Sequence, residues 1–550
     1  MEFNIRHNFA SDFKDYQREL MEKVKFTFLI FTCIGTLFAS SSLFVDAQIT
    51  PKWYILIGGA MLMGVCHIIQ ILQKDNHTSR DKINLLAMTG VVIIYSSFAQ
   101  SLYGILQFCD FLSSTNAFPV TGCFDNPAGF AASLSASLPF GFLIFTQQKG
   151  YKRYVIILMI ITIIVAVILS GSRSGILSIS FLLVYWGFKR ISYPLLLKWI
   201  ATITLLIGLA IGLYNIRIES AEGRLFIWKC TLPMLKENYM TGLGAGGFEA
   251  NYMKHQAMYF QTNPNSQYNI LADNIQSPFC EYIRIVCDYG IIGLILLILI
   301  TGFLLFCYLR HPSLNKEAAI LCWGVVGIFS IFSYPSLYPF TWFILFYSTI
   351  ILIQEPLKSI KKIQFLQRSK RYLILLYFIL SVFTGYKGYQ RIQAEIKWTK
   401  YANLAFLGKA KQLVPQYQEL EKTLGNDRYF LYNYCNILYQ AQDFEASLKI
   451  AIKCQTLWAN YNLELLIGQI YENLQLYNNA ENQYQLAHQM CPNRFLPLYH
   501  LALLFEKTQK RNKAVLLAQE IIIKPIKIPS LLIDNIKQEM NTYILNHSTK

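Results

Sequence analysis

Hydrophobic residues in this chain gather into long runs that polar residues rarely interrupt. Runs of bilayer-spanning length occupy residues 26–45, 53–73, 84–108, 127–146, 154–170, 195–214, 290–309, 317–333, 336–354 and 371–387. A shorter run at 175–188 is expected to form the return leg of a helical hairpin whose tip is Ser172–Gly175. Because a helix of about 20 apolar residues spans the hydrocarbon core, the pattern predicts about eleven transmembrane helices.

The composition agrees with an all-α, polytopic membrane bundle. Hydrophobic residues make up 54% of the 550 residues and charged residues only 15%, which is too apolar for a soluble chain of this length. The first apolar run follows a charged segment and has no small-residue cleavage site, which indicates a retained helix rather than a signal peptide. We therefore expect an N-terminal segment at 1–25 and a membrane domain at 26–389.

The charge of the loops alternates along the chain. Loops on the side of the N-terminus are rich in Lys and Arg, whereas the short loops on the other side carry only Lys52 and Arg173. Basic loops stay in the cytoplasm, so we expect a cytoplasmic N-terminus. The long polar loop at 215–289 and the C-terminal tail then lie on the opposite side of the membrane. This topology also explains the net charge of +17, and no nucleic-acid partner is expected.

The tail, residues 390–550, has the helical periodicity of a soluble α-solenoid and a 34-residue repeat. The clearest copy matches the tetratricopeptide pattern at Gly468, Tyr471, Ala480, Tyr484, Ala487 and Pro492. One repeat away on either side, Ala446 and Ala514 occupy the position of Ala480, where a small residue lets paired helices cross closely. The tail is interpreted either as a stabilising spacer or as a docking surface for a partner protein.

Two arginines on the predicted non-cytoplasmic side are the main candidates for chemistry. Arg173 lies at a hairpin tip and Arg224 in the long loop. An arginine at the mouth of a hydrophobic helix pair is costly unless it holds an anion, and two guanidinium groups can bind a diphosphate bidentately. Arg217 and Arg284 are weaker candidates for the same role. For Arg173 alone, an anchor to lipid phosphate is the alternative interpretation.

The segment from Arg224 to Leu235 predicts a helix lying on the membrane surface, because Leu225, Trp228 and Leu232 share one face. The glycine-rich run 242–247 follows it. This run lacks the Lys-Ser/Thr of a P-loop and the preceding strand of a dinucleotide fold, so it predicts a tight turn. No nucleotide or other cofactor is therefore expected.

A general base for a hydroxyl acceptor is sought among the polar residues of the loop, chiefly Glu281, Asp273 and His255. No metal site is expected, because the His residues are dispersed and no ligand spacing recurs. Asp-x-Asp is also absent from the sequence, which argues against a metal-bound nucleotide sugar. Cys109 and Cys123 share one loop and are a candidate disulfide.

Several short motifs, in order, resemble the O-antigen ligase and polymerase superfamily. They are Ser172-Arg173-Ser174-Gly175, Gly223-Arg224 with Trp228, Gly242-Leu243-Gly244-Ala245-Gly246-Gly247-Phe248, Glu281-Tyr282-Ile283 before Gly290-Ile291-Ile292-Gly293-Leu294, and the earlier Thr121-Gly122-Cys123-Phe124-Asp125-Asn126-Pro127. The resemblance covers roughly residues 80–310. It implies a polytopic enzyme of the bacterial inner membrane that takes a glycan from an undecaprenyl-diphosphate carrier on the periplasmic face, without metal or nucleotide. The loop, the tail and a protein partner of the tail would then be periplasmic.

The resemblance also implies residue roles. Arg173 and Arg224 match the family arginines that hold the diphosphate, but the family His-Asn pair is replaced by Phe279 and Cys280. We therefore expect an inverting transfer of glycan to lipid A core or to protein Ser or Thr. Either the base is one of the three candidates above, or the diphosphate leaving group is activated enough that the acceptor needs little help. A polymerase using the same donor is an alternative. A non-enzymatic membrane scaffold that recruits glycan-assembly partners through its tail is a second alternative, which the missing histidine favours.

Overall fold

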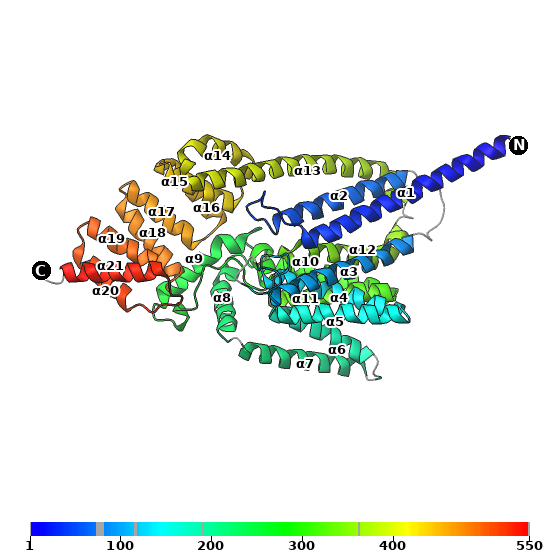
Figure 1. Ribbon diagram of the computed structural model, residues 1–550, viewed down its shortest axis with the longest axis horizontal. Coiled ribbons are helices and arrows are strands. Elements are labelled where there is room, and N and C mark those ends of the chain that lie inside the picture. Colours follow the sequence, from blue (N-terminus) through cyan, green and yellow to red (C-terminus); the bar gives the residue numbers. More distant parts are fainter. Residues whose placement is uncertain are drawn as a thin grey trace. The chain divides into compact units, whose positions relative to one another are not determined.

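The computed structural model describes residues 2–72, 82–114, 118–189, 192, 194–216, 218–360 and 364–547, and every regular element among them is a helix (Figure 1). The chain divides into two compact units. Unit 1 comprises Met1–Leu213, Phe279–Glu281 and Leu297–Ile392, and unit 2 comprises Tyr214–Pro278, Tyr282–Leu296 and Gln393–Lys550. The sequence predicts that the 215–289 loop belongs to the membrane domain. In the structure, most of this loop belongs to unit 2, together with the tail.

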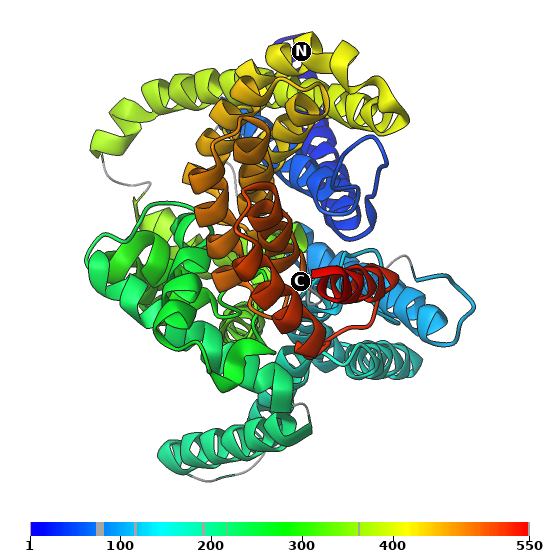
Figure 2. The same cartoon turned by 90° about the vertical axis from the view of Figure 1, so that its left-hand side faces the viewer.

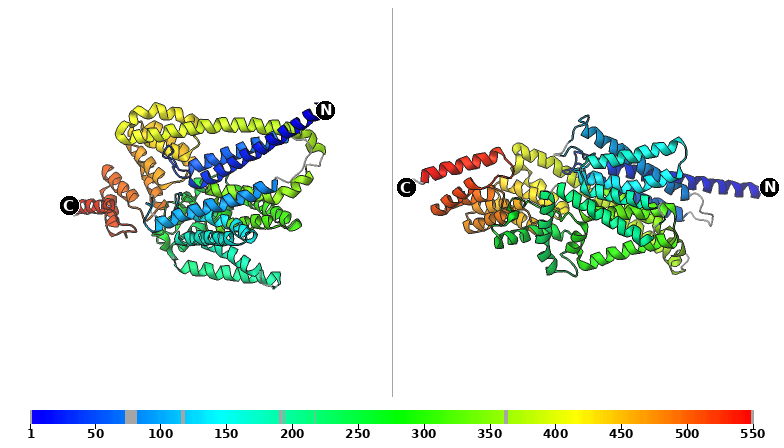
Figure 3. Two further views of the ribbon diagram at one scale, coloured as in Figure 1. Left: turned by 45° about the vertical axis from the view of Figure 1, so that its right-hand side comes forward. Right: turned by 90° about the horizontal axis from the view of Figure 1, so that it is seen from below.

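Unit 1 is a helix bundle. Its helices are α1 (Glu2–Phe38), α2 (Thr50–Leu72), α3 (Lys82–Phe108), α4 (Pro127–Gln147), α5 (Tyr151–Leu169), α6 (Arg173–Lys189), α11 (Leu314–Ile331) and α12 (Pro339–Ile360), with most of α7 (Leu195–Ile216), the later part of α10 (Glu281–Arg310) and the first part of α13 (Gln364–Leu404). Helices α1 and α2 run side by side, as two views show (Figures 1 and 3).

Helix α4 is the centre of this bundle. It packs against α3, α5, α6 and α11, and 78% of its membrane-spanning window is buried. Its start is encoded locally, because the Asn126 side chain accepts hydrogen bonds from the amides of Ala128 (2.8 Å) and Gly129 (3.3 Å), and Pro127 occupies the first helical position. Small buried residues such as Ala131 and Ser135 then allow the neighbouring helices to approach closely.

Among the described residues, seven helices are long and apolar enough to cross a membrane. They are Thr50–Ile69, Met88–Phe108, Pro127–Gln147, Tyr151–Leu169, Leu196–Asn215, Glu281–Arg310 and Leu314–Ile331, with a shorter apolar helix at Pro339–Gln354. A multi-pass membrane protein is therefore supported, while the larger count of about eleven stays a prediction. The first predicted span, 26–45, is longer than the helix found there, because α1 ends at Phe38.

Unit 2 combines the long loop with the C-terminal tail. Its elements are α8 (Ile218–Glu237), α9 (Gly247–Thr262), η1 (Gln267–Asn269), the first part of α10, the last part of α13, η3 (Ala405–Lys409), α14 (Ala410–Leu424), α15 (Arg428–Gln440), α16 (Phe444–Leu457), α17 (Tyr461–Asn473), α18 (Tyr477–Met490), α19 (Leu496–Lys507), α20 (Arg511–Ile523) and α21 (Leu531–His547). In the tail, α15 packs on α16, α17 on α18 and α19 on α20 (Figure 2).

The helix pairs of the tail meet at the small residues that the repeat pattern singles out. A Cβ atom added to Gly468 would lie 2.4 Å from a ring carbon of Tyr484, so only glycine allows this approach of α17 to α18. Ala480 and Ala514 are fully buried. These contacts agree with the packing expected of a repeat array, and the tetratricopeptide assignment itself remains a prediction.

The loop packs against the tail within unit 2. Helix α9 lies against α16 and α18. The buried Gln256 amide donates to the backbone oxygens of Met490 (2.6 Å) and Asp273 (3.0 Å), and the Trp458 indole donates to Gln276 Oε1 at 2.7 Å. The bonds from Gln256 to Met490 and from Trp458 to Gln276 join residues 234 and 182 positions apart in the chain, so the tail is part of the structure that holds the loop.

Candidate functional site

Arg173 opens helix α6 at the tip of the α5–α6 hairpin, and its side chain is half-buried. The turn before it depends on Gly171, whose φ of +67° favours glycine. Ser172 Oγ accepts a hydrogen bond from the Gly175 amide at 3.3 Å, and the adjacent Ser174 Oγ donates to the Phe332 oxygen at 3.2 Å. Arg173 therefore lies at a fixed helix N-terminus, where the positive end of the helix dipole favours an anion.

Glu281 lies in the same unit, at the first position of α10, and is 7% exposed. Its Oε1 atom accepts hydrogen bonds from the Ser336 amide (3.2 Å) and hydroxyl (2.5 Å). Ser336 is held in turn, because its backbone oxygen accepts from the Trp342 indole at 2.8 Å. The short segment 332–336 thus contacts both the residue after Arg173 and the Glu281 carboxylate, so it positions the surroundings of both candidates.

A second polar cluster lies beside this segment and was missed by the sequence analysis. The Tyr338 hydroxyl donates to Asn126 Oδ1 at 3.0 Å, and the Asn126 amide donates to the Tyr334 hydroxyl at 3.3 Å. Burial raises the pKa of the neighbouring Asp125 carboxyl above its ordinary value, and the nearby charge of Asp46 adds to this. The signal in the sequence was a pair of tyrosines and two prolines, at 334–339, where the predicted span 317–333 has ended and the next, 336–354, begins.

The 121–127 stretch is anchored by a buried lysine. Lys52 is fully buried, and its ammonium donates to the backbone oxygens of Ala39 (2.8 Å), Gln48 (2.5 Å) and Cys123 (2.8 Å). Three carbonyl acceptors satisfy the three donors of an ammonium group. Lys52 therefore fixes the stretch that leads into α4 rather than facing a substrate.

Arg224 lies in α8 of unit 2 and is half-buried. This helix buries Phe226. The centroid of the Phe226 ring lies 4.8 Å from that of the stacked Tyr268 ring and 5.3 Å from that of the Phe260 ring. Of the apolar face predicted from the sequence, Leu225 and Leu232 remain 45% and 58% exposed, and the Trp228 indole donates to the Pro278 oxygen at 2.9 Å. Helix α8 therefore has a buried apolar side and also exposed leucines, as expected for a helix at a membrane surface.

The glycine-rich run forms the predicted turn, and its glycines serve close contacts with α10. Gly242, Gly244 and Gly246 all have positive φ. The amides of Leu243 and Gly244 donate to the backbone oxygens of Cys287 (2.8 Å) and Asp288 (2.9 Å). The Asp288 carboxylate also accepts from the Phe248 amide at 3.1 Å, so it caps the start of α9.

Glu249 forms the centre of a buried charge cluster in unit 2. It is 8% exposed, and its Oε1 atom lies 3.8 Å from Arg284 and 3.7 Å from Arg428. Arg284 also lies 3.8 Å from Asp288. The charge of Arg284 is thus matched by two carboxylates of its own unit, which leaves it a poor candidate for binding a diphosphate.

The other two candidate bases also lie in unit 2. Asp273 forms an ion pair with Arg494 of the tail at 2.8 Å. Although burial opposes the change, the hydrogen bond from Arg494 holds the pKa of Asp273 below its ordinary value. His255 is 9% exposed, and its Nε2 atom lies 3.6 Å from Glu237. Asp273 therefore serves the packing of loop on tail, and His255 offers little surface to an acceptor.

The structure thus places Arg173 and Glu281 in unit 1, and Arg224, Asp273 and His255 in unit 2. Arg217 lies outside the described residues. In the described part of the chain, no three His, Cys, Asp or Glu residues are grouped as metal ligands. Cys109 and Cys123 are free thiols, so the candidate disulfide is not formed.

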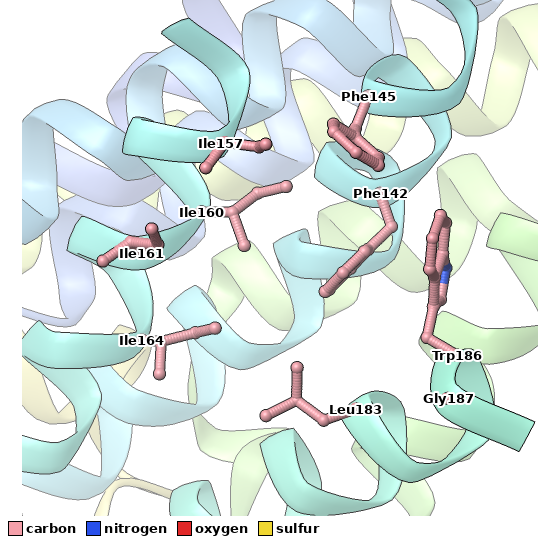
Figure 4. Close-up of a pocket in the computed structure, with 9 residues that line it drawn as sticks. All are labelled: Phe142, Phe145, Ile157, Ile160, Ile161, Ile164, Leu183, Trp186 and Gly187. Carbon is pink, nitrogen blue, oxygen red and sulfur yellow. The ribbon is translucent and has the colours of Figure 1, made fainter. Parts of the chain in front are cut away.

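An apolar cavity of about 380 Å³ lies between α4, α5 and α6 (Figure 4). Phe142, Ile160 and Leu183 are among the side chains that line it, and Trp186 contacts Phe142 with ring centroids 5.0 Å apart. The lining contains no titratable residue, so this cavity is excluded as a centre of acid–base chemistry.

Comparison with known proteins gives a match to a protein family over one region of the chain. Residues 156–298 match the family model described as O-Antigen ligase. The matched stretch runs from α5 into α10 and contains Arg173, Arg224, the glycine-rich turn and all three candidate bases. No curated protein and no solved structure gives a match. The match supports a membrane enzyme of the O-antigen ligase or polymerase type in general.

Proposed function

We propose that this protein is an oligosaccharyltransferase of the O-antigen ligase type, which transfers a glycan from an undecaprenyl-diphosphate carrier to an acceptor hydroxyl. The observation that carries the proposal is the position of Arg173 at the N-terminus of α6, within the stretch that matches the ligase family. A guanidinium group beside the positive end of a helix suits a diphosphate. Arg224, in the same matched stretch, is the second arginine of the proposal.

The reaction follows from these groups. The acceptor oxygen attacks the anomeric carbon, and the bond between this carbon and the phosphate oxygen breaks with its electron pair remaining on the diphosphate. Arg173 and Arg224 neutralise the charge that grows there, an electrostatic role of the oxyanion-hole type. The acceptor proton passes to a carboxylate on the opposite face, and attack from that face inverts the anomeric centre.

Glu281 is the base that the contacts favour. It belongs to the unit that contains Arg173, whereas Asp273 is paired with Arg494 and His255 is enclosed. Ser336 donates to one carboxylate oxygen, Oε1, and so fixes the rotamer of the group that would take the proton. Glu281 would then replace the family histidine, whose place in this chain is taken by Phe279.

We further propose that the chemistry takes place on the periplasmic face of a bacterial inner membrane. The distribution of Lys and Arg supports a cytoplasmic N-terminus with the loop and the tail on the opposite side. Single cysteines in a cysteine-free background, placed at exposed positions 261 and 445, test this orientation. Labelling of both by an impermeant maleimide in intact spheroplasts supports it, and labelling of either only after lysis contradicts it.

The acceptor is lipid A core or protein Ser or Thr, and a polymerase would instead use a second carrier-linked glycan. Purified protein is given a labelled undecaprenyl-diphosphate glycan and each acceptor class in turn. Product on lipid A core or on protein supports the ligase, and product only on a second carrier-linked glycan identifies the polymerase. Intact donor with every acceptor would favour a scaffold that recruits partners through its tetratricopeptide-like tail.

A further inference from the structure

The apolar cavity of unit 1 extends along helix α5 and opens at the surface of the bundle. Four isoleucines of α5 share the face that lines it, over about 10 Å of the helix axis. Phe142 and Trp186 lie across the cavity from them (Figure 4). Ile161 is 51% exposed and Leu183 is 44% exposed, so the cavity can be reached from outside the protein. The four isoleucines are Ile157, Ile160, Ile161 and Ile164.

A hydrocarbon chain suits this lining. Apart from Gly187, every lining residue has an aliphatic or aromatic side chain. A Cβ atom added to Gly187 would meet nothing within 4 Å apart from its own helix backbone and its chain neighbours, so this wall of the cavity borders open space. Helix α5 is one of the helices long and apolar enough to cross a membrane, and a groove along such a helix follows the direction of lipid acyl chains.

The cavity has a basic segment at the end where α5 begins. Lys149, Lys152 and Arg153 lie in this segment, and residues 147–154 include no Asp or Glu. The Arg153 guanidinium carbon lies 4.3 Å from the centroid of the Phe145 ring, and Phe145 is part of the cavity lining. Arg153 therefore joins the apolar wall of the cavity to the basic segment.

The charge of Arg153 is not matched by a carboxylate of any described residue. Lys189, at the end of α6, differs in this respect because it pairs with Glu317 at 2.6 Å. No side chain caps the N-terminus of α5, and the positive end of the helix dipole adds to the charge of Arg153. A phosphate group, which accepts hydrogen bonds from a guanidinium group bidentately, suits this end of the cavity.

Two exposed tyrosines indicate the depth of Arg153 in the membrane. Tyr151 and Tyr154 are 74% and 75% exposed, at the start of an otherwise apolar helix. Tyrosine is enriched at the level of the lipid headgroups. Because Arg153 lies between these tyrosines in the chain, its side chain is expected at the level of the lipid phosphates.

We propose that this cavity holds an acyl chain of an anionic phospholipid whose phosphate group binds Arg153. A zwitterionic lipid has the same chains, but its ammonium group offsets the phosphate charge, so it is held less well beside three basic residues. Arg173 follows the far end of α5, about 28 Å away along a helix of 19 residues. The lipid site is therefore distinct from the proposed diphosphate site, and it does not rest on the proposed function.

The test uses full-length protein purified in detergent, and native mass spectrometry measures how much added lipid stays bound. The probes are phosphatidylglycerol and phosphatidylethanolamine with identical acyl chains, and undecaprenyl phosphate. Arg153→Gln removes the charge, and Gly187→Leu places a side chain in the open space. The matched controls are Arg310→Gln, an arginine over the Phe306 ring at the end of α10, and Gly208→Leu, at an exposed glycine of α7.

The wild type and both controls should retain phosphatidylglycerol about tenfold better than phosphatidylethanolamine, because hydrogen bonds to a charged group are the stronger ones. Arg153→Gln should lose this preference, and Gly187→Leu should retain less of both lipids, each at the wild-type Tm. No preference in the wild type would mean ordinary surrounding lipid only. That result, an unchanged preference in Arg153→Gln, or displacement of phosphatidylglycerol by an equal concentration of undecaprenyl phosphate would overturn the proposal.

Discussion

The backbone oxygen of Glu249 accepts a hydrogen bond from the amide of Ala459 at 2.9 Å, although 210 residues separate them in the chain. Glu249 belongs to the helix after the glycine-rich turn, and Ala459 to the linker between α16 and α17. The same glutamate carboxylate lies 3.7 Å from Arg428 of the tail. The tail therefore contributes to the structure of the loop that carries Arg224, in addition to burying its own core.

A chain that stops after residue 392 should retain its membrane helices and lose the ordered loop. Truncation removes the partners of Glu249, Gln256 and Asp273 and leaves buried polar groups exposed to solvent. We expect limited proteolysis to cut the truncated protein between residues 238 and 278 at least tenfold faster than the full-length protein. Equal cleavage rates, in truncated protein that remains monodisperse, would show that the loop folds without the tail.

Acid should destabilise unit 2 through His488. Burial lowers the pKa of His488 from 6.5 to about 4, and the nearby charge of Lys524 acts in the same direction. The folded state therefore binds fewer protons than the unfolded state between these pH values. The stability that unit 2 gains from burying a neutral imidazole is present above pH 6.5 and is lost as the pH falls towards 4. The loss is on the order of 3 kcal/mol at pH 4.

Chemical denaturation between pH 7 and pH 4 measures this effect. His488→Gln should flatten the pH dependence of the free energy of unfolding of unit 2. His311→Gln, which lies outside unit 2, is the control and should leave the dependence as in the wild type. If the free energy of unfolding changes with pH equally in the wild type and in His488→Gln, His488 is not the source of the acid sensitivity.

Glu281→Gln should abolish base catalysis while preserving the fold. Glutamine keeps an oxygen that can accept from Ser336, so the hydrogen bond of the wild type has a substitute while the charge is lost. We expect a fall in kcat of about 100-fold or more. Ser336→Ala removes only the positioning group and should cause a smaller fall that leaves the pH profile of kcat similar in shape.

Two variants serve as controls for the choice of base. Asp273→Asn and His255→Gln should retain transfer close to the wild-type rate if both proteins keep the wild-type Tm. If Glu281→Gln is as active as the wild type and either control is inactive in folded protein, the base lies in unit 2.

The sequence predicted the membrane class and the candidate arginines because those signals are local. Apolar runs, alternating Lys and Arg, and the hairpin at Ser172–Gly175 each lie within a short window. The hydrogen-bond partners of the candidate bases Glu281 and Asp273 could not be predicted in this way. Ser336 is 55 residues from Glu281, and Arg494 is 221 residues from Asp273, so only the fold brings them together. The glycine-rich turn was predicted, but its hydrogen bonds to Asp288 were not.

The exposed face of α8 illustrates the same limit. Periodicity placed Leu225, Trp228 and Leu232 on one side and treated that side as the apolar face. The helix also has a second apolar side, formed by Phe226 and Met234, which is the buried one. A sequence with two apolar sides does not say which one packs on protein.

The proposed binding of the donor diphosphate by Arg173 and Arg224 can be tested by Arg→Lys substitution. Arg173→Lys, Arg224→Lys and the control Arg310→Lys, at the far end of α10 from Glu281, are purified and given a labelled undecaprenyl-diphosphate glycan with its acceptor. Lysine keeps the charge but loses the bidentate fork. We expect at least a tenfold fall in the rate of glycan transfer for both site variants and none for the control. Near-wild-type transfer by Arg173→Lys and Arg224→Lys, at equal Tm, would contradict the proposed binding.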